Sequence, residues 1–376
     1  MRSLGLYIHI PFCRRKCLYC DFCSLEQQGD AEMEAYADAV CRDLARWATQ
    51  CRDRRVNTVY FGGGTPSLLP PSLLLRMLES IARLYHVEND AEITLECNPA
   101  TGSAESFSTL RRGGFNRISV GLQSTHENEL RALGRIHTFA DFERTYADLR
   151  EAGFENISAD LMSGIPEQTV ESYLESIRRL CALSPEHISA YGLSVEEETP
   201  FGRMGDRLSL PDEETARQMY FEGIGLLASL GYRQYEISNY AKRGYESRHN
   251  LKYWNCEEYL GFGPAAYSDF NGDRFGNSRD VAAYIHGREI LAERETPSPS
   301  ERMNEYIMLR MRLTDGVSAA AFSKRFGQDL NSLLGGRLAA FESGGFVRRT
   351  EDGWAFTTEG FYVSNTILAE ILDFSS

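Results

Sequence analysis

Apolar runs with the length of buried β-strands recur through the first half of the chain, and segments with helical patterns separate them. The runs predicted as strands are residues 4–10, 56–62, 91–97, 116–122, 155–162 and 186–193. The segments between them place apolar residues at helical spacing, most clearly near 31–49 and 71–85. Six strands joined by helical crossovers predict an α/β fold with a parallel sheet and right-handed connections.

Residues suited to chemistry gather at the ends of these predicted strands, which is where sites form in parallel sheets. They are the cysteines of segment 13–20, the turn 62–65, Glu96, Gln123 and Asp160. The pattern leaves open whether the sheet curls into a partial barrel or stays an open doubly wound sheet. Either arrangement brings these residues to one edge of the sheet.

The pattern changes near the Pro- and Ser-containing stretch 295–301, ETPSPSE, which predicts a linker. Beyond it, 316–327 predicts a short helix, 330–341 a second helix, and 345–357 a hairpin around an Asp-Gly pair. This order of elements is typical of a winged-helix domain. We therefore expect two domains, which cover residues 1–295 and 301–376.

The charge balance argues against a nucleic-acid partner. Forty basic and 54 acidic residues give a net charge of -14, whereas nucleic-acid binding needs a basic stripe. The predicted C-terminal domain carries 8 basic and 10 acidic residues, so protein packing is favoured over DNA binding. The sequence has no run of 18 apolar residues, so it predicts no transmembrane helix. The N-terminus lacks the features of a signal peptide. We expect a cytoplasmic protein, with peripheral contact to a membrane left open.

Four of the nine cysteines crowd between Cys13 and Cys23, which indicates a metal site more than a disulfide framework. Cys13, Cys17 and Cys20 have the spacing C-x3-C-x2-C, which lets three soft thiolates bind three corners of a [4Fe–4S] cluster and leaves its fourth iron open. A structural zinc site would usually show a second cysteine pair, and unligated thiols are the remaining alternative. Cys23 is interpreted as a spare thiol, because a fourth ligand would block the open iron.

The cysteine motif resembles that of the radical-SAM superfamily. It follows the first predicted strand, Tyr19 stands directly before its third cysteine, and GGGTPS (62–67) ends the second predicted strand. The resemblance implies a partial (β/α)6 barrel and a [4Fe–4S] cluster on Cys13, Cys17 and Cys20, with S-adenosylmethionine on the open iron. A glycine-rich turn alone could also cradle a phosphate, but the upstream cysteines favour S-adenosylmethionine.

Six further motifs resemble, in order, the oxygen-independent coproporphyrinogen III oxidase group of that superfamily: YIHIPFC, FGGGTPS, LECNP, ISVGLQS, LGRIH and SADLMSGIP. They cover about half of the chain, and the C-terminal domain also matches. The resemblance implies that Tyr7, Gly63 and Glu96 contact the cluster-bound S-adenosylmethionine. Other residues match positions that bind a second S-adenosylmethionine in the oxidase, namely Tyr19, Gly64, Thr65, Gln123, Arg135 and Asp160. Taken singly, each carboxylate could equally cap a helix or face solvent.

Two branches share these motifs, and two departures favour the heme chaperone branch. The oxidase branch has a long segment before its cysteines and a fourth cysteine two residues after the third. Here the first cysteine is already Cys13, and Phe22 takes the place of that fourth cysteine. GFGPAA (261–266) imitates a dinucleotide-binding turn but opens no early βαβ unit, so we expect a tight turn near the sheet edge.

A second motif, HNLKYW (249–254), resembles the HN-x-x-YW motif of the heme chaperones. The resemblance implies that His249 contacts heme, with Tyr253 and Trp254 offering flat apolar faces to the porphyrin. The alternative is that His249 is a structural histidine beside core aromatic residues.

The resulting hypothesis is a heme chaperone that binds heme, a [4Fe–4S] cluster and S-adenosylmethionine. It would pass heme to acceptor hemoproteins, whether membrane-bound or cytosolic. One rival is a radical enzyme that decarboxylates the propionates of coproporphyrinogen, and S-adenosylmethionine cleavage is compatible with both functions. A plain iron–sulfur electron carrier is the other rival, and the nucleotide-binding motifs argue against it.

Overall fold

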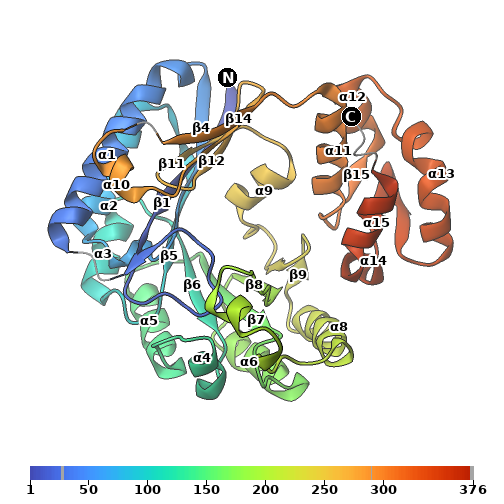
Figure 1. Cartoon of the computed structure of the whole chain (residues 1–376), viewed down its shortest axis with the longest axis horizontal. Helices are drawn as coiled ribbons and strands as arrows, with labels where there is room; N and C mark the ends of the chain where they lie inside the picture. Colours follow the sequence, from blue (N-terminus) through green and yellow to red (C-terminus); the bar gives the residue numbers. More distant parts are fainter. Residues whose placement is uncertain (27–28, 289, 373–376) are drawn as a thin grey trace.

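The computed structural model describes residues 1–26, 29–288 and 290–372, and a curved sheet of twelve strands is its centre. Six neighbouring parallel strands follow chain order: β1 (Arg2–Ile10), β4 (Arg54–Gly63), β5 (Val87–Cys97), β6 (Arg117–Gln123), β7 (Ile157–Ser163) and β8 (His187–Gly192). Each overlaps a predicted strand, which confirms the α/β fold. The main helices cover the outer face of the sheet (Figure 1): α1 (Asp30–Ala48), α2 (Pro71–Leu84), α3 (Ala104–Arg112), α5 (Phe139–Glu151), α6 (Val170–Ala182) and α8 (Glu213–Ser229).

The sequence left open whether the sheet is a partial barrel or an open doubly wound sheet. The structure shows a partial barrel, because the curved sheet does not close. On one side β8 pairs with β10 (Asn239–Ala241), and β10 pairs in turn with β9 (Arg233–Gln234). On the other side β1 pairs with β11 (Tyr259–Phe262). An antiparallel meander continues from β11 through β12 (Tyr267–Phe270), β13 (Asp273–Asn277) and β14 (Leu291–Glu295). Residues 263–266 form the turn from β11 to β12, as expected for GFGPAA.

The burial of β6 shows how the curved sheet encloses a site. All seven of its residues are buried, because strands flank it on both sides and helices cover its outer face. Side chains of a strand alternate between faces, so Arg117, Ser119, Gly121 and Gln123 share the inner face. These inward positions are polar or small, which leaves room for a ligand instead of a packed apolar core.

The C-terminal part has its own apolar core and the expected order of two helices and a hairpin. Its elements are α11 (Pro299–Arg310), β15 (Val317–Ser318), α12 (Ala319–Phe326), α13 (Leu330–Ser343), β16 (Val347–Thr350), β17 (Gly353–Phe356), α14 (Thr358–Tyr362) and α15 (Ser364–Ile371). The prediction of a linker over 295–301 is wrong in its second half. Ser298 caps α11, Pro299 is its first residue, and Glu301 completes a capping box, so the Ser-Pro-Ser-Glu sequence begins a helix.

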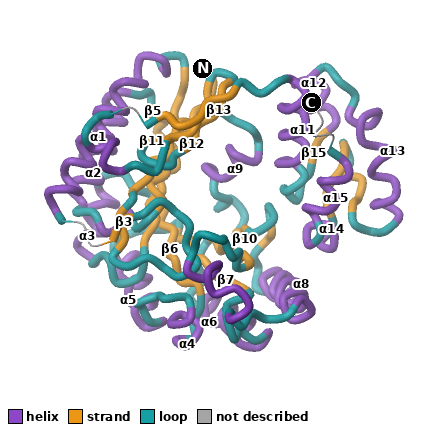
Figure 2. Tube along the Cα trace, in the orientation of Figure 1, coloured by secondary structure: helices purple, strands orange, loops and turns teal. Residues whose placement is uncertain are grey.

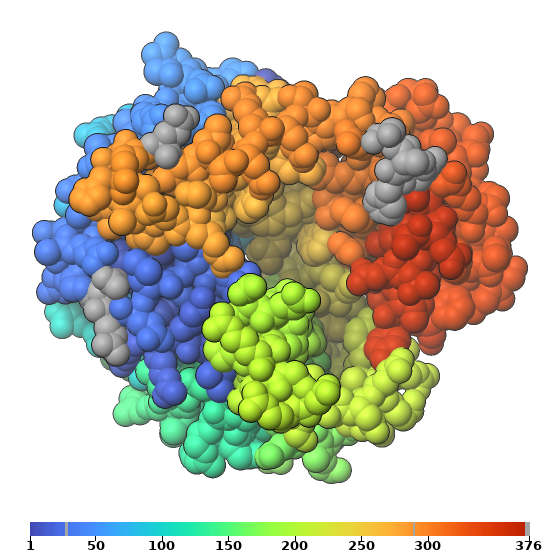
Figure 3. Space-filling view, viewed as in Figure 1, coloured from blue at the N-terminus to red at the C-terminus, as the bar shows by residue number. Residues whose placement is uncertain are grey.

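The short helix α9 (Arg248–Trp254) lies between the barrel and the C-terminal domain (Figures 1 and 2). The surface is hollowed between these two parts of the molecule (Figure 3). Further short elements are β2 (Phe12–Cys13), β3 (Leu25–Glu26), α4 (Glu127–Ala132), α7 (Pro200–Met204) and α10 (Val281–Ile285). Within the described ranges, no helix is long and apolar enough to cross a membrane.

Candidate functional site

A cavity of about 600 Å³ occupies the inner face of the sheet, at the carboxyl ends of the parallel strands. The cysteine loop, the glycine-rich turn after β4 and the inward side chains of β5 to β8 line it. It collects every residue predicted for the cluster and S-adenosylmethionine except Tyr7. These are Cys13, Cys17, Tyr19, Cys20, Gly63, Gly64, Thr65, Glu96, Gln123, Arg135 and Asp160.

The three cysteines of the motif share one partly exposed loop at the rim of the cavity, and none forms a disulfide. The loop is fixed by backbone hydrogen bonds, from Leu18 N to Leu133 O at 3.0 Å and from Cys20 N to Cys17 O at 3.2 Å. Burial raises the pKa of the Cys20 thiol to about 11. The Cys20 thiol is therefore protonated at neutral pH until a cation compensates its charge, which is what a metal cluster does.

Cys23 is set apart from these three thiols. Its side chain is buried, and its Sγ donates to the carbonyl of Arg279 at 3.5 Å. By contrast, the Sγ atoms of Cys13 and Cys17 lie 3.6 Å from Thr65 Oγ1 and 3.5 Å from Arg135 Nη1. This placement fits the interpretation of Cys23 as a spare thiol.

The donor set fits a [4Fe–4S] cluster better than a single metal ion. Among the residues that the structure describes, no three His, Cys, Asp or Glu side chains are placed to hold a single metal ion. A zinc site needs such convergence, whereas a cubane spreads its ligands over separate iron corners. Three thiols from one loop, beside an open cavity and the guanidinium of Arg135, fit the cluster.

Next to the thiols, the glycine turn and Glu96 form a polar wall. Gly63 has a φ of 111°, and its N–H donates to Glu96 Oε2 at 2.9 Å. A side chain at Gly64 would stand 2.7 Å from the carbonyl oxygen of Phe12, so only glycine fits this turn. Tyr60 donates to Glu96 Oε1 at 2.8 Å. Burial raises the pKa of Glu96 to about 7, because no cation is paired with the buried carboxylate, and an ammonium group bound beside it would stabilise its charged form.

Further polar residues line the cavity, namely Gln123, Tyr191, Arg135 and Asp160. Gln123 has a φ of 72°, which is uncommon outside glycine, and its Oε1 accepts from Tyr191 Oη at 2.9 Å. Burial also raises the pKa of Asp160, whose Oδ1 accepts from Ser119 at 3.3 Å. A cation and a carboxyl thus face one cavity, an arrangement suited to a zwitterionic ligand.

Arg117 is a cavity residue that the sequence analysis missed. Its side chain is only 2% exposed, and its guanidinium has no hydrogen bond or ion pair with any residue that the structure describes. The signal was available, because Arg117 is in phase with Ser119, Gly121 and Gln123 along one strand. Asn98 and Tyr191 were also missed, and they line the cavity at strand ends.

Helix α9 lies on the inner side of the barrel, beside this cavity. Its first two backbone N–H groups, of Arg248 and His249, donate to the two oxygens of Glu92 at 3.0 Å each. Asn250 is the residue of α9 that lines the cavity. The ring of Tyr7 lies behind the cavity wall, stacked on Tyr60 at 6.1 Å between ring centroids.

The three residues predicted to contact heme, His249, Tyr253 and Trp254, come together on α9. The ring of His249 is buried, with Nδ1 2.8 Å from Thr58 Oγ1 and Nε2 2.8 Å from Tyr253 Oη. Burial lowers the pKa of His249 to about 3, so the ring is neutral, as metal ligation requires. Both ring nitrogens already have hydrogen-bond partners, Thr58 and Tyr253. Ligation of a heme iron would require His249 to give up one of these partners. The heme role of His249 therefore stays a prediction.

Comparisons with known proteins identify the superfamily of the chain. The Radical SAM superfamily profile matches residues 7–180, and that of the HemN C-terminal domain matches residues 298–363. The chain is 35% identical to the heme chaperone HemW of Bacillus subtilis over 97% of this chain and 98% of that protein. Its identity to the heme chaperone HemW of Escherichia coli is 34%, over 97% of both chains.

Among solved structures, the coproporphyrinogen III oxidase (HemN) of Escherichia coli, a radical SAM enzyme, superimposes with a TM-score of 0.88. That likeness covers 99% of this chain and 91% of the oxidase at 21% sequence identity. At this identity the likeness shows a shared fold and does not carry over the activity.

Proposed function

We propose that this chain, which belongs to the HemW family of the radical SAM superfamily, is a heme chaperone that carries a [4Fe–4S] cluster and S-adenosylmethionine. The observation that carries the cofactor part is the cavity in which three thiols, a glycine turn and two buried carboxyls meet. Heme delivery to acceptor hemoproteins, membrane-bound or cytosolic, is inferred from the family. We further propose a cytoplasmic location. We also propose that no nucleic acid is a partner, because the net charge of -14 opposes binding to phosphates.

Cys13, Cys17 and Cys20 would hold the cluster. Glu96 and Gly63 would receive the ammonium group of S-adenosylmethionine, and Arg135 would pair with a carboxylate. When bound and reduced, the cluster and S-adenosylmethionine supply one-electron cleavage of a carbon–sulfur bond. Tyr60 and Gly63 hold the Glu96 carboxyl in place with hydrogen bonds at 2.8 and 2.9 Å, so the residue is oriented before the ligand arrives.

Heme would bind at α9, beside His249, Tyr253 and Trp254. In support, the ring of His249 is neutral and the surface is hollowed where α9 lies between the two domains (Figure 3). A cavity of about 600 Å³ that must also hold the cluster and S-adenosylmethionine leaves little space for a porphyrin. We therefore place heme outside this cavity, next to α9. The His249 ring faces β4, so it would have to exchange its partner Thr58 or Tyr253 to reach the heme.

The deciding experiment compares two ligands on one reconstituted protein. Anaerobic protein is titrated with heme and, separately, incubated with reductant, S-adenosylmethionine and coproporphyrinogen. We expect a Soret shift that saturates near one heme per chain and no decarboxylated product. Absence of heme binding together with decarboxylation of coproporphyrinogen would overturn the chaperone function in favour of the oxidase.

A further inference from the structure

Arg117 carries a buried positive charge that no group of the protein compensates directly. Its side chain is 2% exposed, and among the described residues its guanidinium has no hydrogen-bond or ion-pair partner. A charge that is moved from water into a protein interior is costly unless a partner is present. Because Arg117 lines the large cavity, the missing partner can enter as a ligand.

Arg117 marks the inner end of this cavity, away from the cysteine loop. Arg117 and Gln123 stand at the two ends of the seven-residue strand β6, which places their backbones about 20 Å apart. Arg117 is in register with Thr94, two residues before the pair of Glu96 and Ser119. The groups proposed to receive S-adenosylmethionine therefore lie nearer the cysteine loop, and the inner end is left for another ligand.

The two buried carboxyls of the cavity are not direct counter-ions of Arg117. Neither of these described residues, Glu96 and Asp160, forms an ion pair with its guanidinium. Burial raises the pKa of each carboxyl, and the positive charge of Arg117 offsets this effect only in part. The hydroxyls of Ser119 and Ser189 also line the cavity and can donate or accept hydrogen bonds. The cavity thus offers a cation and neutral polar groups to an incoming anion.

We propose that Arg117 anchors a carboxylate-binding subsite at the inner end of the cavity, which takes an organic acid distinct from S-adenosylmethionine. A planar carboxylate matches the fork of the guanidinium and accepts two parallel N–H bonds from it. A phosphate would bring a second negative charge towards Glu96 and Asp160, which disfavours it. The subsite deepens the proposed function and rests on it only for the position of S-adenosylmethionine at the outer end.

The first test asks whether Arg117 destabilises the protein when no ligand is bound. Thermal midpoints of the full-length, cluster-free chain are measured for the wild type and for Arg117→Met, an apolar replacement. We expect Arg117→Met to melt a few degrees higher, because it removes a buried charge without a partner. Arg150→Met is the matched control and should melt lower, since Arg150 donates to both carboxylate oxygens of Glu186 at 2.8 Å. A lower midpoint in Arg117→Met would show a structural arginine and overturn the subsite.

The second test titrates sodium propionate as the probe, at constant ionic strength, and follows the same thermal midpoint. The wild-type midpoint should rise with propionate and stay constant with propionamide, its neutral isostere. Arg117→Met should weaken the apparent affinity for propionate about 10-fold, as expected for the loss of charge-assisted hydrogen bonds. Arg117→Lys keeps the charge without the fork, so its affinity should fall between the two. Equal responses in the wild type and Arg117→Met, or a stronger response to phosphate than to propionate, would overturn the subsite.

Reconstituted protein separates the possible sources of the carboxylate. Propionate should still stabilise protein that carries the cluster and saturating S-adenosylmethionine. Loss of this response would assign Arg117 to the carboxylate of S-adenosylmethionine, and its loss only after heme has bound would assign Arg117 to a heme propionate. Either result would overturn a separate organic acid. Protein that binds no iron would instead refute the proposed function and leave the cluster-free titrations standing.

Discussion

Buried Glu96 is the residue whose environment most directly sets a pH dependence. Burial without a paired cation holds its pKa at about 7, and the nearby Asp160 adds to the effect. An unfolded glutamate titrates near about 4.3. The folded protein therefore retains a proton that the unfolded chain loses, so this residue's contribution to stability is present below about pH 4 and is lost as the pH rises towards 7.

Replacement of Glu96 by Gln should flatten this dependence. Between pH 5 and 8 the thermal midpoint of cluster-free protein should fall less in Glu96→Gln than in the wild type. The corresponding difference in the free energy of unfolding is about 1–3 kcal/mol at most. Circular dichroism melts at several pH values measure it, and Glu105→Gln on the exposed face of α3 is the control. An identical pH slope in Glu96→Gln and the wild type would contradict the buried, proton-holding carboxyl.

Cys23 should be dispensable for the cluster, because its thiol is buried against the Arg279 carbonyl. Iron analysis and visible spectra of anaerobically reconstituted protein should show about four irons per chain in Cys23→Ala, as a cubane requires. Cys17→Ala should lose the colour. Bleaching by Cys23→Ala alone would show that the open-iron arrangement is wrong.

His249 tests the heme site at the level of one side chain. His249→Ala should weaken heme binding or change the ligand-field spectrum, because an axial nitrogen is removed. The cluster should survive, since its three thiol ligands need no imidazole. If heme titration gives the wild-type spectrum and affinity, His249 is the structural histidine that its bonds to Thr58 and Tyr253 already describe, and heme is bound by other groups.

At the scale of elements, two side chains hold the N-terminus of α9: Ser247 accepts from the backbone N–H of Asn250 at 3.4 Å, and Glu92 accepts from the two residues before it. Glu92 lies on β5 and accepts from the first two backbone N–H groups of the helix, which would otherwise be buried without partners. Helix α9 is only seven residues long and has little stability of its own. The position of His249 is therefore set by a carboxylate that is distant in sequence.

Removing that acceptor should loosen the helix. Glu92→Ala should cost about 1–3 kcal/mol, because two buried donors lose their partner, and should speed hydrogen exchange over residues 248–254. Asp90→Ala is a matched control. The Asp90 side chain meets the same helix through an exposed ion pair with Arg248 at 3.7 Å, and the Asp90 carbonyl, which accepts from Arg248 at 2.6 Å, is kept in the variant. Equal exchange rates in the two variants would show that Glu92 does not position α9.

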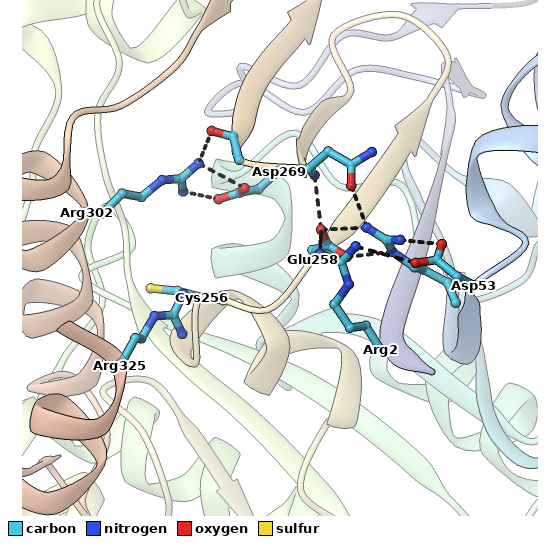
Figure 4. A network of polar contacts seen from close by, with 10 residues as sticks. Arg2, Asp53, Cys256, Glu258, Asp269, Arg302 and Arg325 are labelled. Carbon is cyan, nitrogen blue, oxygen red and sulfur yellow. Dashed lines mark hydrogen bonds and ion pairs between the residues drawn. The ribbon is translucent and has the colours of Figure 1, made fainter. Parts of the chain in front are cut away.

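At the scale of the whole molecule, arginines of the C-terminal domain hold it against the barrel (Figure 4). Arg302 of α11 forms a two-pronged ion pair with Asp269, with its second contact at 3.1 Å. Arg325 donates to the carbonyl of Cys256 at 3.0 Å, just beyond the end of α9. Arg302 and Arg325 thus join the domain to residues of the barrel side of the chain.

Loss of the Arg302 contact should release the domain. Arg302→Ala leaves Asp269 partly buried without its cation, so we expect a loss of about 2–4 kcal/mol and faster cleavage by trypsin after Arg294, the site in segment 294–302 that the variant keeps. Arg203→Ala, which removes an exposed ion pair with Glu198, should leave the cleavage rate unchanged. Unchanged proteolysis in Arg302→Ala would show that apolar packing alone holds the domains together.

The sequence by itself determined the parallel strands, their order and the three cysteines. Strand periodicity and C-x3-C-x2-C spacing are local properties, and crossover handedness then brings the strand ends to one edge. Alternation along β6 also determines that Arg117 faces inward, although its role as a cavity residue was not predicted. The helix start at Ser298 and Pro299 was equally local, and it was misjudged because Pro and Ser also mark linkers.

Only the tertiary structure decided that the barrel stays open, that Glu92 caps α9 and that His249 has partners on both ring nitrogens. Each depends on contacts between residues far apart in the chain, which no local pattern encodes. The pKa of Glu96 and the neutrality of His249 belong to the same class, because burial sets both and burial exists only after folding.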